Sequence, residues 1–279
     1  MQDYQQLLFP YAYNILGSAE DARDAVQDVL YTFLASPKEH IAQEKSYLIK
    51  SVINQSINIR NRKKKMTSTE EVSLPEPVAT ETADTNLNMK DIVSYSMLVL
   101  LEQLNPKERA VFILKEAFNY SHEEIAEVLS STVENSRKLL SRAKARLAQS
   151  RRPATQTVLP AGVLDKYIYA IRGRDTQALE HLLTADITYH ADGGAHLNVF
   201  RKFSAGIHEV AELMLYIYDR YTAALSCKTA TINHQPALLY YDGNQLVACQ
   251  VFGVTEDGKI YQINNVLDPE KLKGLAMDQ

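Results

Sequence analysis

Hydrophobic residues recur at helical spacing through the first 65 residues of the chain. A first apolar stripe ends at Gly17, and the capping-box pattern from Ser18 to Asp21 then predicts the start of a second helix. In this second helix, apolar residues follow i, i+3, i+4 spacing as far as Leu34, and the opposite face is polar. A third helix is predicted from about Ser46 and ends in a basic block. The pattern therefore predicts an all-α segment.

Periodicity disappears between residues 66 and 88, where threonine, proline and acidic residues are frequent. This composition predicts a linker. Residues 73–77 (Ser-Leu-Pro-Glu-Pro) form a short apolar island within it. Helical patterns return from about residue 89 to residue 150.

Residues 105–148 carry the pattern of a helix-turn-helix. Asn105 followed by Pro106 predicts one helix start, and a capping box at 121–124 predicts a second, shorter helix. Residues 130–132 break the periodicity, and a basic, polar helix follows from Val133. A short helix, a tight turn and a basic helix are together typical of a DNA-binding helix-turn-helix.

The segment from about 158 to 279 changes from helices to strands. Asp-Gly pairs at 242–243 and 257–258 predict hairpin turns between the later strands. This order predicts an α+β domain with helices on an antiparallel sheet. The predicted helices cover residues 163–171, 179–183 and 207–218, and the predicted strands cover 187–190, 225–232, 237–241, 246–254 and 260–266.

The composition excludes several classes of protein. Of 279 residues, 46% are apolar, the formal net charge is −4, and the two cysteines are Cys227 and Cys249. Wholesale disorder and a disulfide scaffold are thereby excluded. No run of 18 apolar residues predicts a membrane helix, and the acidic N-terminus does not resemble a signal peptide. We therefore expect a cytoplasmic protein of about two domains.

Cationic residues gather in two blocks that contain no acidic residue. Residues 60–65 hold five cations and residues 137–152 hold seven. The stretch between them, residues 66–91, carries six acids against one lysine. Two basic blocks on either side of an acidic linker favour two contacts with nucleic acid. The alternative is that each block is the solvated end of a helix.

Four residues of the last segment are candidates for acid–base chemistry: Asp186, Tyr189, His190 and Asp192. Asp192 precedes two glycines, so an aspartate that stabilises a turn is favoured over a catalytic base. The histidines and cysteines lack the spacing of metal ligands. The sequence contains no P-loop, dinucleotide fingerprint or nucleophile elbow. We therefore expect no catalytic residue, no metal site and no cofactor.

Residues 1–150 resemble an extracytoplasmic-function sigma factor of bacterial RNA polymerase. Leu-Gly-Ser at 16–18 and Asp-Ala-Arg-Asp-Ala-Val-Gln-Asp at 21–28 are similar to the family's region 2 motif. Residues 45–65 resemble the part of region 2 that opens and reads the −10 element. Residues 104–147 resemble region 4, which reads the −35 element. Serines at 130–131 depart from the family, which usually has glycine and an apolar residue in this turn.

The resemblance implies two macromolecular partners: core RNA polymerase, through its clamp and flap, and promoter DNA. The residues implied in polymerase binding lie on the second helix and are Asp21, Asp24, Gln27 and Asp28. Those expected at DNA lie on two polar helix faces and are Tyr47, Asn54, Asn58, Arg60, Arg62, Lys63, Lys64, Glu134, Asn135, Arg137, Lys138, Ser141 and Arg142. An aromatic ring at position 47 could stack on an unpaired base, with a half-buried core tyrosine as the alternative.

The last segment resembles the SnoaL-like branch of the nuclear-transport-factor-2-like superfamily, in which a curved sheet and helices form a cone with an internal pocket. Three motifs, at 73–77, 192–196 and 268–272, are similar to those of sigma factors that such an extension regulates in cis. The implied regulatory contacts are Leu74, Pro75, Glu76, Pro77, Asp192, Gly193, Gly194, Asp268, Pro269, Lys271 and Leu272.

The expected domains are region 2 (1–65), the linker (66–88), region 4 (89–152) and a SnoaL-like domain (158–279). The expected function is that of a sigma factor, without enzymatic activity, modulated by its C-terminal domain. The alternative is a helix-turn-helix regulator fused to a cone that binds or converts a small molecule. The acidic face of the second helix favours the sigma factor, because a repressor has no need of it. An unidentified small ligand of the cone stays open as a further partner.

Overall fold

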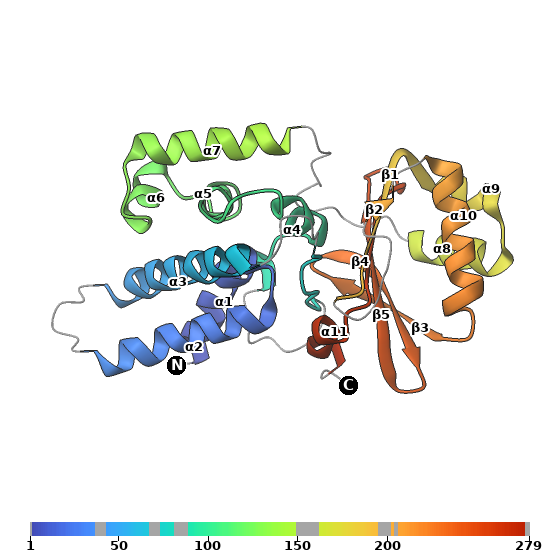
Figure 1. Ribbon diagram of the computed structural model, residues 1–279, viewed down its shortest axis with the longest axis horizontal. Coiled ribbons are helices and arrows are strands. Elements are labelled where there is room, and N and C mark those ends of the chain that lie inside the picture. Colours follow the sequence, from blue (N-terminus) through green and yellow to red (C-terminus); the bar gives the residue numbers. More distant parts are fainter. Residues whose placement is uncertain are drawn as a thin grey trace. The chain divides into compact units, whose positions relative to one another are not determined.

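The computed structural model describes residues 2–36, 43–66, 73–80, 89–148, 162–194, 202–203 and 206–276. The chain forms two compact units, which are drawn in Figure 1. The first holds residues 1–71, 83–93 and 97–152, and the second holds 72–82, 94–96 and 153–279. The described part of the predicted linker, residues 73–80, therefore belongs to the second unit.

The first unit is built from helices. The segment expected to be region 2 contains α1 (Gln2–Leu16), α2 (Ala19–Ala35) and α3 (Glu44–Met66), which pack against one another. Helices α1 and α3 also contact α5 of region 4, so both regions share one compact unit. The remaining elements are the 3-10 turn η2 (Met89–Asp91), α4 (Tyr95–Leu101), α5 (Pro106–Glu116), α6 (His122–Val128) and α7 (Val133–Leu147). The first two residues of α4 belong to the second unit.

Side-chain caps begin these helices where the sequence predicted them. The Ser18 hydroxyl caps α2. Asn105 and Ser121 each form a complete capping box, with Glu108 and Glu124 respectively. A cap satisfies backbone N–H groups of the first turn that have no partner within the helix. The helix starts are therefore encoded locally.

The turn between α6 and α7 contains a residue in the left-handed region. Ser130 has a φ of 47°. The Ser131 N–H donates to the Ala126 carbonyl at 2.9 Å, which closes the turn. Glycine reaches this conformation without the steric cost of a Cβ. The serine that departs from the family pattern therefore lies at a strained position.

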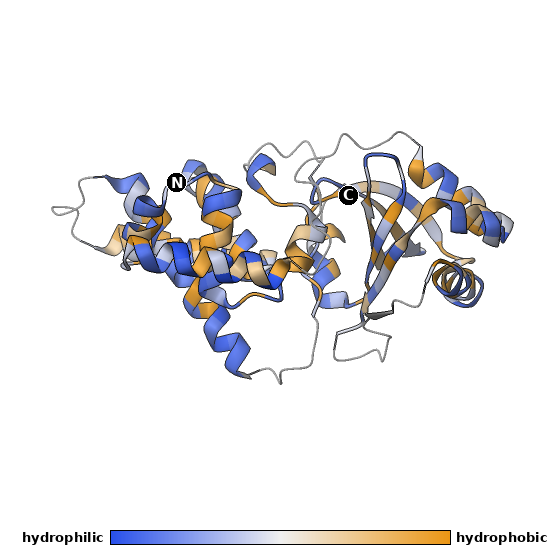
Figure 2. Ribbon diagram, turned by 90° about the horizontal axis from the view of Figure 1, so that it is seen from above, coloured by the Kyte–Doolittle hydropathy of each residue, from blue (hydrophilic) through white to orange (hydrophobic). Residues whose placement is uncertain are grey.

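The helices of both units are amphipathic, as Figure 2 shows by the alternation of hydrophilic and hydrophobic colour around them. In α7 the predicted apolar stripe is buried: Leu139, Leu140, Ala143 and Leu147. Helix α5 is the exception, because buried residues surround nearly its whole circumference. A charged residue in α5, such as Arg109, must therefore find its partners inside the protein.

The second unit packs helices on one face of a sheet (Figure 1). In the described residues the sheet has six strands in the order β2-β1-β6-β5-β4-β3. Its elements are α8 (Val163–Gly173), α9 (Thr176–Leu182), β1 (Leu183–Asp192), β2 (Lys202–Phe203), α10 (Ile207–Ile217), the π-helical turn η3 (Tyr218–Thr222), β3 (Ser226–Ile232), β4 (Gln235–Asp242), β5 (Gln245–Val254), β6 (Ile260–Val266) and α11 (Pro269–Ala276). The α+β class is as predicted.

The sheet is mixed, which corrects the expectation of a purely antiparallel sheet. The consecutive strands β3, β4, β5 and β6 pair antiparallel with one another. Strands β1 and β6 instead run parallel, with Tyr189 opposite Ile263. The Asp-Gly turns fix only strands that follow one another directly. Since α10 and the four strands β2 to β5 separate β1 from β6 in the chain, tertiary packing sets their relative direction.

The two faces of β1 have different roles. Ile187, Tyr189 and Ala191 belong to the core beneath α8, α9 and α10. Because side chains alternate along a strand, His190 and Asp192 lie on the opposite face of the sheet.

Within the described residues, no helix has the length and apolar character needed to span a membrane.

We expect Ser130→Gly to stabilise the helix-turn-helix by about 0.5–1 kcal/mol, because relief of the left-handed strain exceeds the entropy that glycine adds to the unfolded chain. Native-state hydrogen exchange of amides in α6 and α7 measures this local free energy. Ser131→Gly, in the same turn but without a positive φ, is the control and should not stabilise. Faster exchange in Ser130→Gly would contradict the prediction.

Candidate nucleic-acid interface and linker-docking site

The outer face of α7 carries the residues predicted to contact DNA in region 4. The N-cap Thr132 accepts a hydrogen bond from the Asn135 N–H at 3.1 Å and thereby fixes the start of the helix. The six predicted residues of α7 are all exposed: Glu134, Asn135, Arg137, Lys138, Ser141 and Arg142. A polar face with several cations, held by a buried apolar stripe, is suited to the surface of DNA.

Two of these cations have carboxylate partners within region 4. Lys138 lies 2.6 Å from Glu134, and Arg137 lies 3.9 Å from Glu123. Exposed ion pairs of this kind contribute about 0–1 kcal/mol. A DNA phosphate can therefore replace the carboxylates at little cost.

The residues of α3 that were predicted to contact DNA fall into two sets. One set is exposed, and the side chains of the other, the occupied set, are hydrogen-bonded to other parts of the protein. The exposed residues are Asn58, Arg62, Lys63 and Lys64. Lys63 pairs with Asp21 of α2 at 2.5 Å. The Tyr47 side chain is 40% exposed, and its ring centroid lies 6.0 Å from that of Phe33. A large part of this ring therefore remains at the surface.

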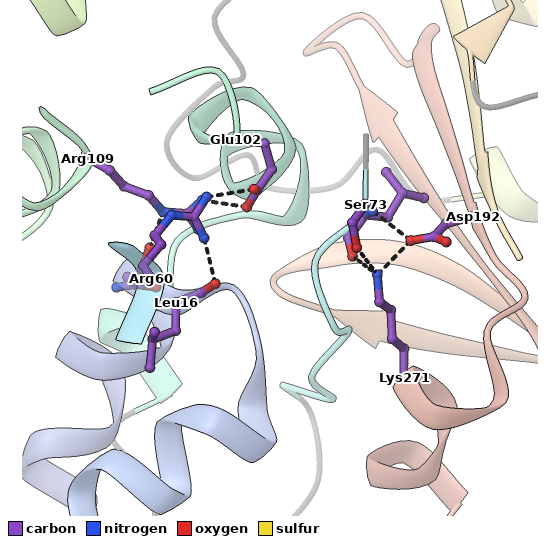
Figure 3. A network of polar contacts seen from close by, with 9 residues as sticks. Leu16, Arg60, Ser73, Glu102, Arg109, Asp192 and Lys271 are labelled. Carbon is purple, nitrogen blue, oxygen red and sulfur yellow. Dashed lines mark hydrogen bonds and ion pairs between the residues drawn. The ribbon is translucent and has the colours of Figure 1, made fainter. Parts of the chain in front are cut away.

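Asn54 and Arg60 form the occupied set. The Asn54 Nδ2 donates to the carbonyl of Val128, at the end of α6, at 2.9 Å. Arg60 donates through Nη1 to the Leu16 carbonyl at 2.7 Å and through Nη2 to Glu102 at 2.6 Å (Figure 3). In this arrangement, protein atoms satisfy two side chains that were predicted to contact DNA.

Sequence analysis missed Glu102 and Arg109, which complete this network. The Arg109 side chain is 0% exposed. Its Nη1 lies 2.5 Å from Glu102 Oε1, and its Nε donates to the Asn14 carbonyl at 2.8 Å. The only signal in the sequence was a charged residue directly before the apolar run 110–114.

Electrostatics keeps Glu102 and Arg109 of this network charged. Burial and the neighbouring Arg60 lower the pKa of Arg109 to about 10, while Glu102 opposes that shift. Burial by itself raises the pKa of Glu102, but the guanidinium groups of Arg109 and Arg60 outweigh it, so the pKa is lowered. At neutral pH one carboxylate therefore faces two guanidinium cations.

The acidic face of α2 lies at the surface. Asp24, Gln27 and Asp28 are exposed, as the sequence predicted. Tyr31 and Leu34 continue along the helix as exposed large hydrophobic side chains. Acidic groups beside exposed apolar groups form a surface suited to a protein partner.

Residues 73–80 of the linker are docked on the second unit. The buried Leu74 donates its backbone N–H to Asp192 Oδ2 at 2.8 Å, and its carbonyl accepts from Lys271 Nζ at 2.6 Å. Lys271 also reaches Asp192 Oδ2 at 2.6 Å and Ser73 Oγ at 2.5 Å (Figure 3). The fold thus brings together three motifs that are far apart in the sequence.

Asp192 lies at the centre of the docked segment's contacts. Its Oδ1 accepts from the Gly194 N–H at 2.9 Å, which closes the turn that the sequence suggested. Burial raises the pKa of Asp192, but Lys271 and the backbone N–H donors outweigh it and lower the pKa. A Cβ at Gly194, where φ is 62°, would lie 2.6 Å from the carboxyl carbon of Asp268. Glycine is therefore required by both the backbone conformation and the close approach.

The remainder of the docked segment is also held by polar contacts. Tyr95 Oη donates to the Pro75 carbonyl at 2.6 Å. The Val78 N–H donates to Asn233 Oδ1 at 3.0 Å, and the Asn233 N–H returns a bond to the Val78 carbonyl at 2.9 Å. Pro75, Glu76 and Pro77 are buried, as is Leu272, in the helix that Pro269 begins. No sequence motif singled out Tyr95 or Asn233.

The candidate acid–base residues do not converge on one site. Tyr189 accepts from Asn265 Nδ2 at 3.2 Å on the core side of the sheet. His190 lies on the opposite side, where its Nδ1 is 3.1 Å from Asn264 Oδ1. Asp192, with a lowered pKa and a lysine partner, is poorly suited to accept a proton. Among the residues that the structure describes, no group of histidine, cysteine or acidic side chains could hold a metal ion.

Residues 95–147 match the family model for sigma-70, region 4. The chain is 26% identical to the ECF RNA polymerase sigma factor SigJ of Mycobacterium tuberculosis, over 99% of this chain and 93% of that protein. It is 25% identical to the probable ECF RNA polymerase sigma factor SigI of the same species, over 99% of this chain and 94% of that protein. The crystal structure of the extracytoplasmic function sigma factor SigJ covers 98% of this chain and 97% of its own, with 23% identity and a TM-score of 0.76.

Both relatives align with the helical regions and with the C-terminal α+β domain. A helix-turn-helix regulator of another class would not account for similarity to sigma factors along the whole chain. The region 4 match, the relatives and the shared fold together identify the chain as an extracytoplasmic-function sigma factor of RNA polymerase, a transcription initiation factor rather than an enzyme.

Proposed function

We propose that the two helical regions guide core RNA polymerase to promoters through separate surfaces. The observation that carries this proposal is the exposed polar and basic face of α7, within a helix-turn-helix that matches region 4. Helix α7 would contact the −35 element, and the exposed residues of α3 the −10 element. The acidic and apolar face of α2 would bind the clamp, and region 4 would meet the flap. The chain would act in the cytoplasm, where promoter DNA is found.

Different residues of α7 would supply the affinity for DNA and the specificity for its sequence. Arg137, Lys138 and Arg142 are cations that can neutralise phosphates, which supplies affinity but carries no sequence information. Asn135 lies in the first turn of the helix, where a side-chain amide can hydrogen-bond to a base edge. This division gives different expected outcomes for the two kinds of substitution.

We also propose that the C-terminal domain modulates the sigma regions in cis through the docked segment 73–80. Promoter elements about 20 base pairs apart are separated by roughly 60–70 Å, at about 3.4 Å per base pair. Docking by Asp192 and Lys271 restrains part of the chain that must span this distance. A small ligand of the C-terminal domain would act by binding the docked and released forms with different affinity.

In vitro transcription with purified core polymerase tests the proposed function. The intact chain should direct initiation from specific promoters, and variants of the α7 face should lose it. Initiation that is independent of the chain, or of the α7 face, would contradict the proposal.

Asp24→Arg combined with Asp28→Arg should weaken binding to core polymerase about tenfold or more, because it reverses charge on the proposed contact surface of α2. A fluorescence titration with core polymerase measures the effect. Asp165→Arg with Glu256→Arg makes the same charge change at exposed positions of the second unit and should leave the affinity unchanged. Unchanged affinity in the α2 variant, with its helical circular dichroism intact, would remove α2 from the interface.

Arg142→Ala should weaken DNA binding evenly across sequences and reduce the slope of log affinity against log salt by about one. Asn135→Ala should instead change preference at one base position. Anisotropy of labelled duplexes at several salt concentrations distinguishes the two. Lys166→Ala, an exposed cation of α8, is the control. An unchanged salt slope in Arg142→Ala would show that this cation does not contact phosphate.

Leu74→Ala and Lys271→Ala should both release the docked segment and change transcription in the same direction. The leucine change removes about 2–3 kcal/mol of buried apolar contact. Because one docking event depends on both residues, the double variant should add little to the stronger single variant. Lys273→Ala, on the same helix and paired with Glu270, is the control. Fully additive effects would show that the two residues do not act on one equilibrium.

A further inference from the structure

Region 2 and region 4 are joined inside the first unit by a small set of polar and aromatic contacts. The Tyr11 and Phe118 rings stack with centroids 4.0 Å apart. The Asn14 Nδ2 donates to the Asp91 carbonyl at 2.8 Å, and its Oδ1 accepts from the Val93 N–H at 3.1 Å. These contacts bind α1 to region 4 at Asp91, Val93 and Phe118.

The charged part of this junction is the network of Arg60, Glu102 and Arg109 (Figure 3). Glu102 belongs to region 4 and offers one carboxylate oxygen to Arg109 and the other to Arg60 of region 2, at 2.5 and 2.6 Å. Arg109 in turn crosses back to region 2 by donating to the Asn14 carbonyl. Each region thus contributes an arginine, but only region 4 contributes the acid.

Arg60 belongs to the basic block of α3, whose neighbours Arg62, Lys63 and Lys64 are exposed. Arg60 differs, because its side chain is only 14% exposed and its guanidinium is bound by Glu102. A carboxylate and a phosphate present the same kind of acceptor oxygens to a guanidinium. Asn54, on the same helix, is likewise engaged by region 4, through the Val128 carbonyl.

We propose that Glu102 is an internal competitor of DNA phosphate, which binds Arg60 and holds region 2 and region 4 together until DNA takes its place. The assignment of Arg60 to DNA rests on the proposed function of α3. The closed arrangement cannot read two promoter elements at once, because hydrogen-bonded regions cannot lie roughly 60 Å apart. Opening must therefore break the Arg60–Glu102 pair before promoter binding is complete.

Two contacts of the network survive opening and reduce its free-energy cost. Arg60 keeps its bond to the Leu16 carbonyl, because both residues belong to region 2. Glu102 keeps Arg109, because both belong to region 4. The other polar contacts that the structure describes between the two regions are lost on opening: Arg60–Glu102, Arg109–Asn14, Asn54–Val128, Tyr11–Tyr120 and the bonds of the Asn14 side chain with Asp91 and Val93.

Arg109 also limits how strongly the closed arrangement is held. Its Nη2 is buried and has no hydrogen-bond partner in the described part of the chain. An unsatisfied donor on a charged, buried group is costly. When the regions open, water can hydrate Arg109 Nη2, and this offsets part of the free energy that the broken contacts contributed. A competing anion can therefore separate the two regions at this junction.

Glu102→Gln is the test, because Glu102 is not among the residues proposed to contact DNA or polymerase. It removes the negative charge and keeps the size of the side chain. The matched control is Glu116→Gln, which removes an ion pair to Lys144 at 2.7 Å that lies wholly within region 4. Both variants are made in the full chain.

Two readouts separate the junction from DNA binding. Hydrogen exchange of the Val93 amide, which donates to Asn14, reports opening without DNA. Anisotropy of a short fluorescein-labelled bubble duplex reports affinity. Glu102→Gln should speed the exchange and tighten DNA binding, each about 5- to 30-fold, because it lowers the population of the closed form. Glu116→Gln should change neither.

The other outcomes overturn the proposal in distinguishable ways. Unchanged exchange in Glu102→Gln would show that Glu102 does not hold the regions together. This result would not depend on the transcription measured with α7 variants, which tests the proposed sigma function separately. Faster exchange with unchanged affinity would show that Arg60 does not contact phosphate, and would count against the proposed role of α3. If Glu102→Gln fails to fold, Glu102→Asp takes its place, since a shorter carboxylate cannot reach both arginines; unchanged exchange and affinity there would also overturn the proposal.

Discussion

The burial of the Arg109 charge in α5 is the constraint on which the helical unit depends. A guanidinium with no solvent contact requires an anion and hydrogen-bond acceptors close by. Glu102 supplies the anion from the segment before α5, and the Asn14 carbonyl supplies an acceptor from the end of α1. Satisfying one side chain thus fixes three pieces of chain relative to one another. Arg60 enters the same network because Glu102 has a second oxygen to offer.

The second unit applies the same rule to a segment of irregular chain. Residues 73–78 lie outside helix and strand, yet most of them are buried, and Ala79 forms an isolated β-bridge with Ile232 of β3. Side chains of the domain satisfy several of their backbone groups: Asp192, Lys271, Asn233 and Tyr95. Backbone groups of Thr231 and Asn233 bond Thr80 and Val78. Because each partner is specific to one backbone group, the segment docks in one register. Docking is therefore a defined state, on which regulation in cis can act.

Several side chains have one set of partners in this structure and another in the proposed function. Arg60 and Asn54 are bound to region 4 here and are proposed to meet DNA. Lys63 and Asp21 pair with each other, although one is assigned to DNA and the other to polymerase. The exposed face of α7 has only weak surface pairs to exchange. Opening of region 2 from region 4 is therefore the step that makes Arg60 and Asn54 of α3 available.

The sequence alone determined the features that depend on neighbouring residues: the capped starts of α2, α5 and α6, the polar face of α7, the α+β order and the glycine turn after Asp192. Each follows from local spacing or from one residue's conformational preference. Only the tertiary structure decided the parallel pairing of β1 with β6, the Arg60–Glu102–Arg109 network, and the contacts of Tyr95 and Asn233 with the linker. These join residues far apart in the chain, and a single sequence carries no periodic signal for such pairs. Arg60 shows the limit most clearly, because its basic neighbours predict an exposed cation, whereas a carboxylate distant in the chain binds it and leaves only 14% of its side chain exposed.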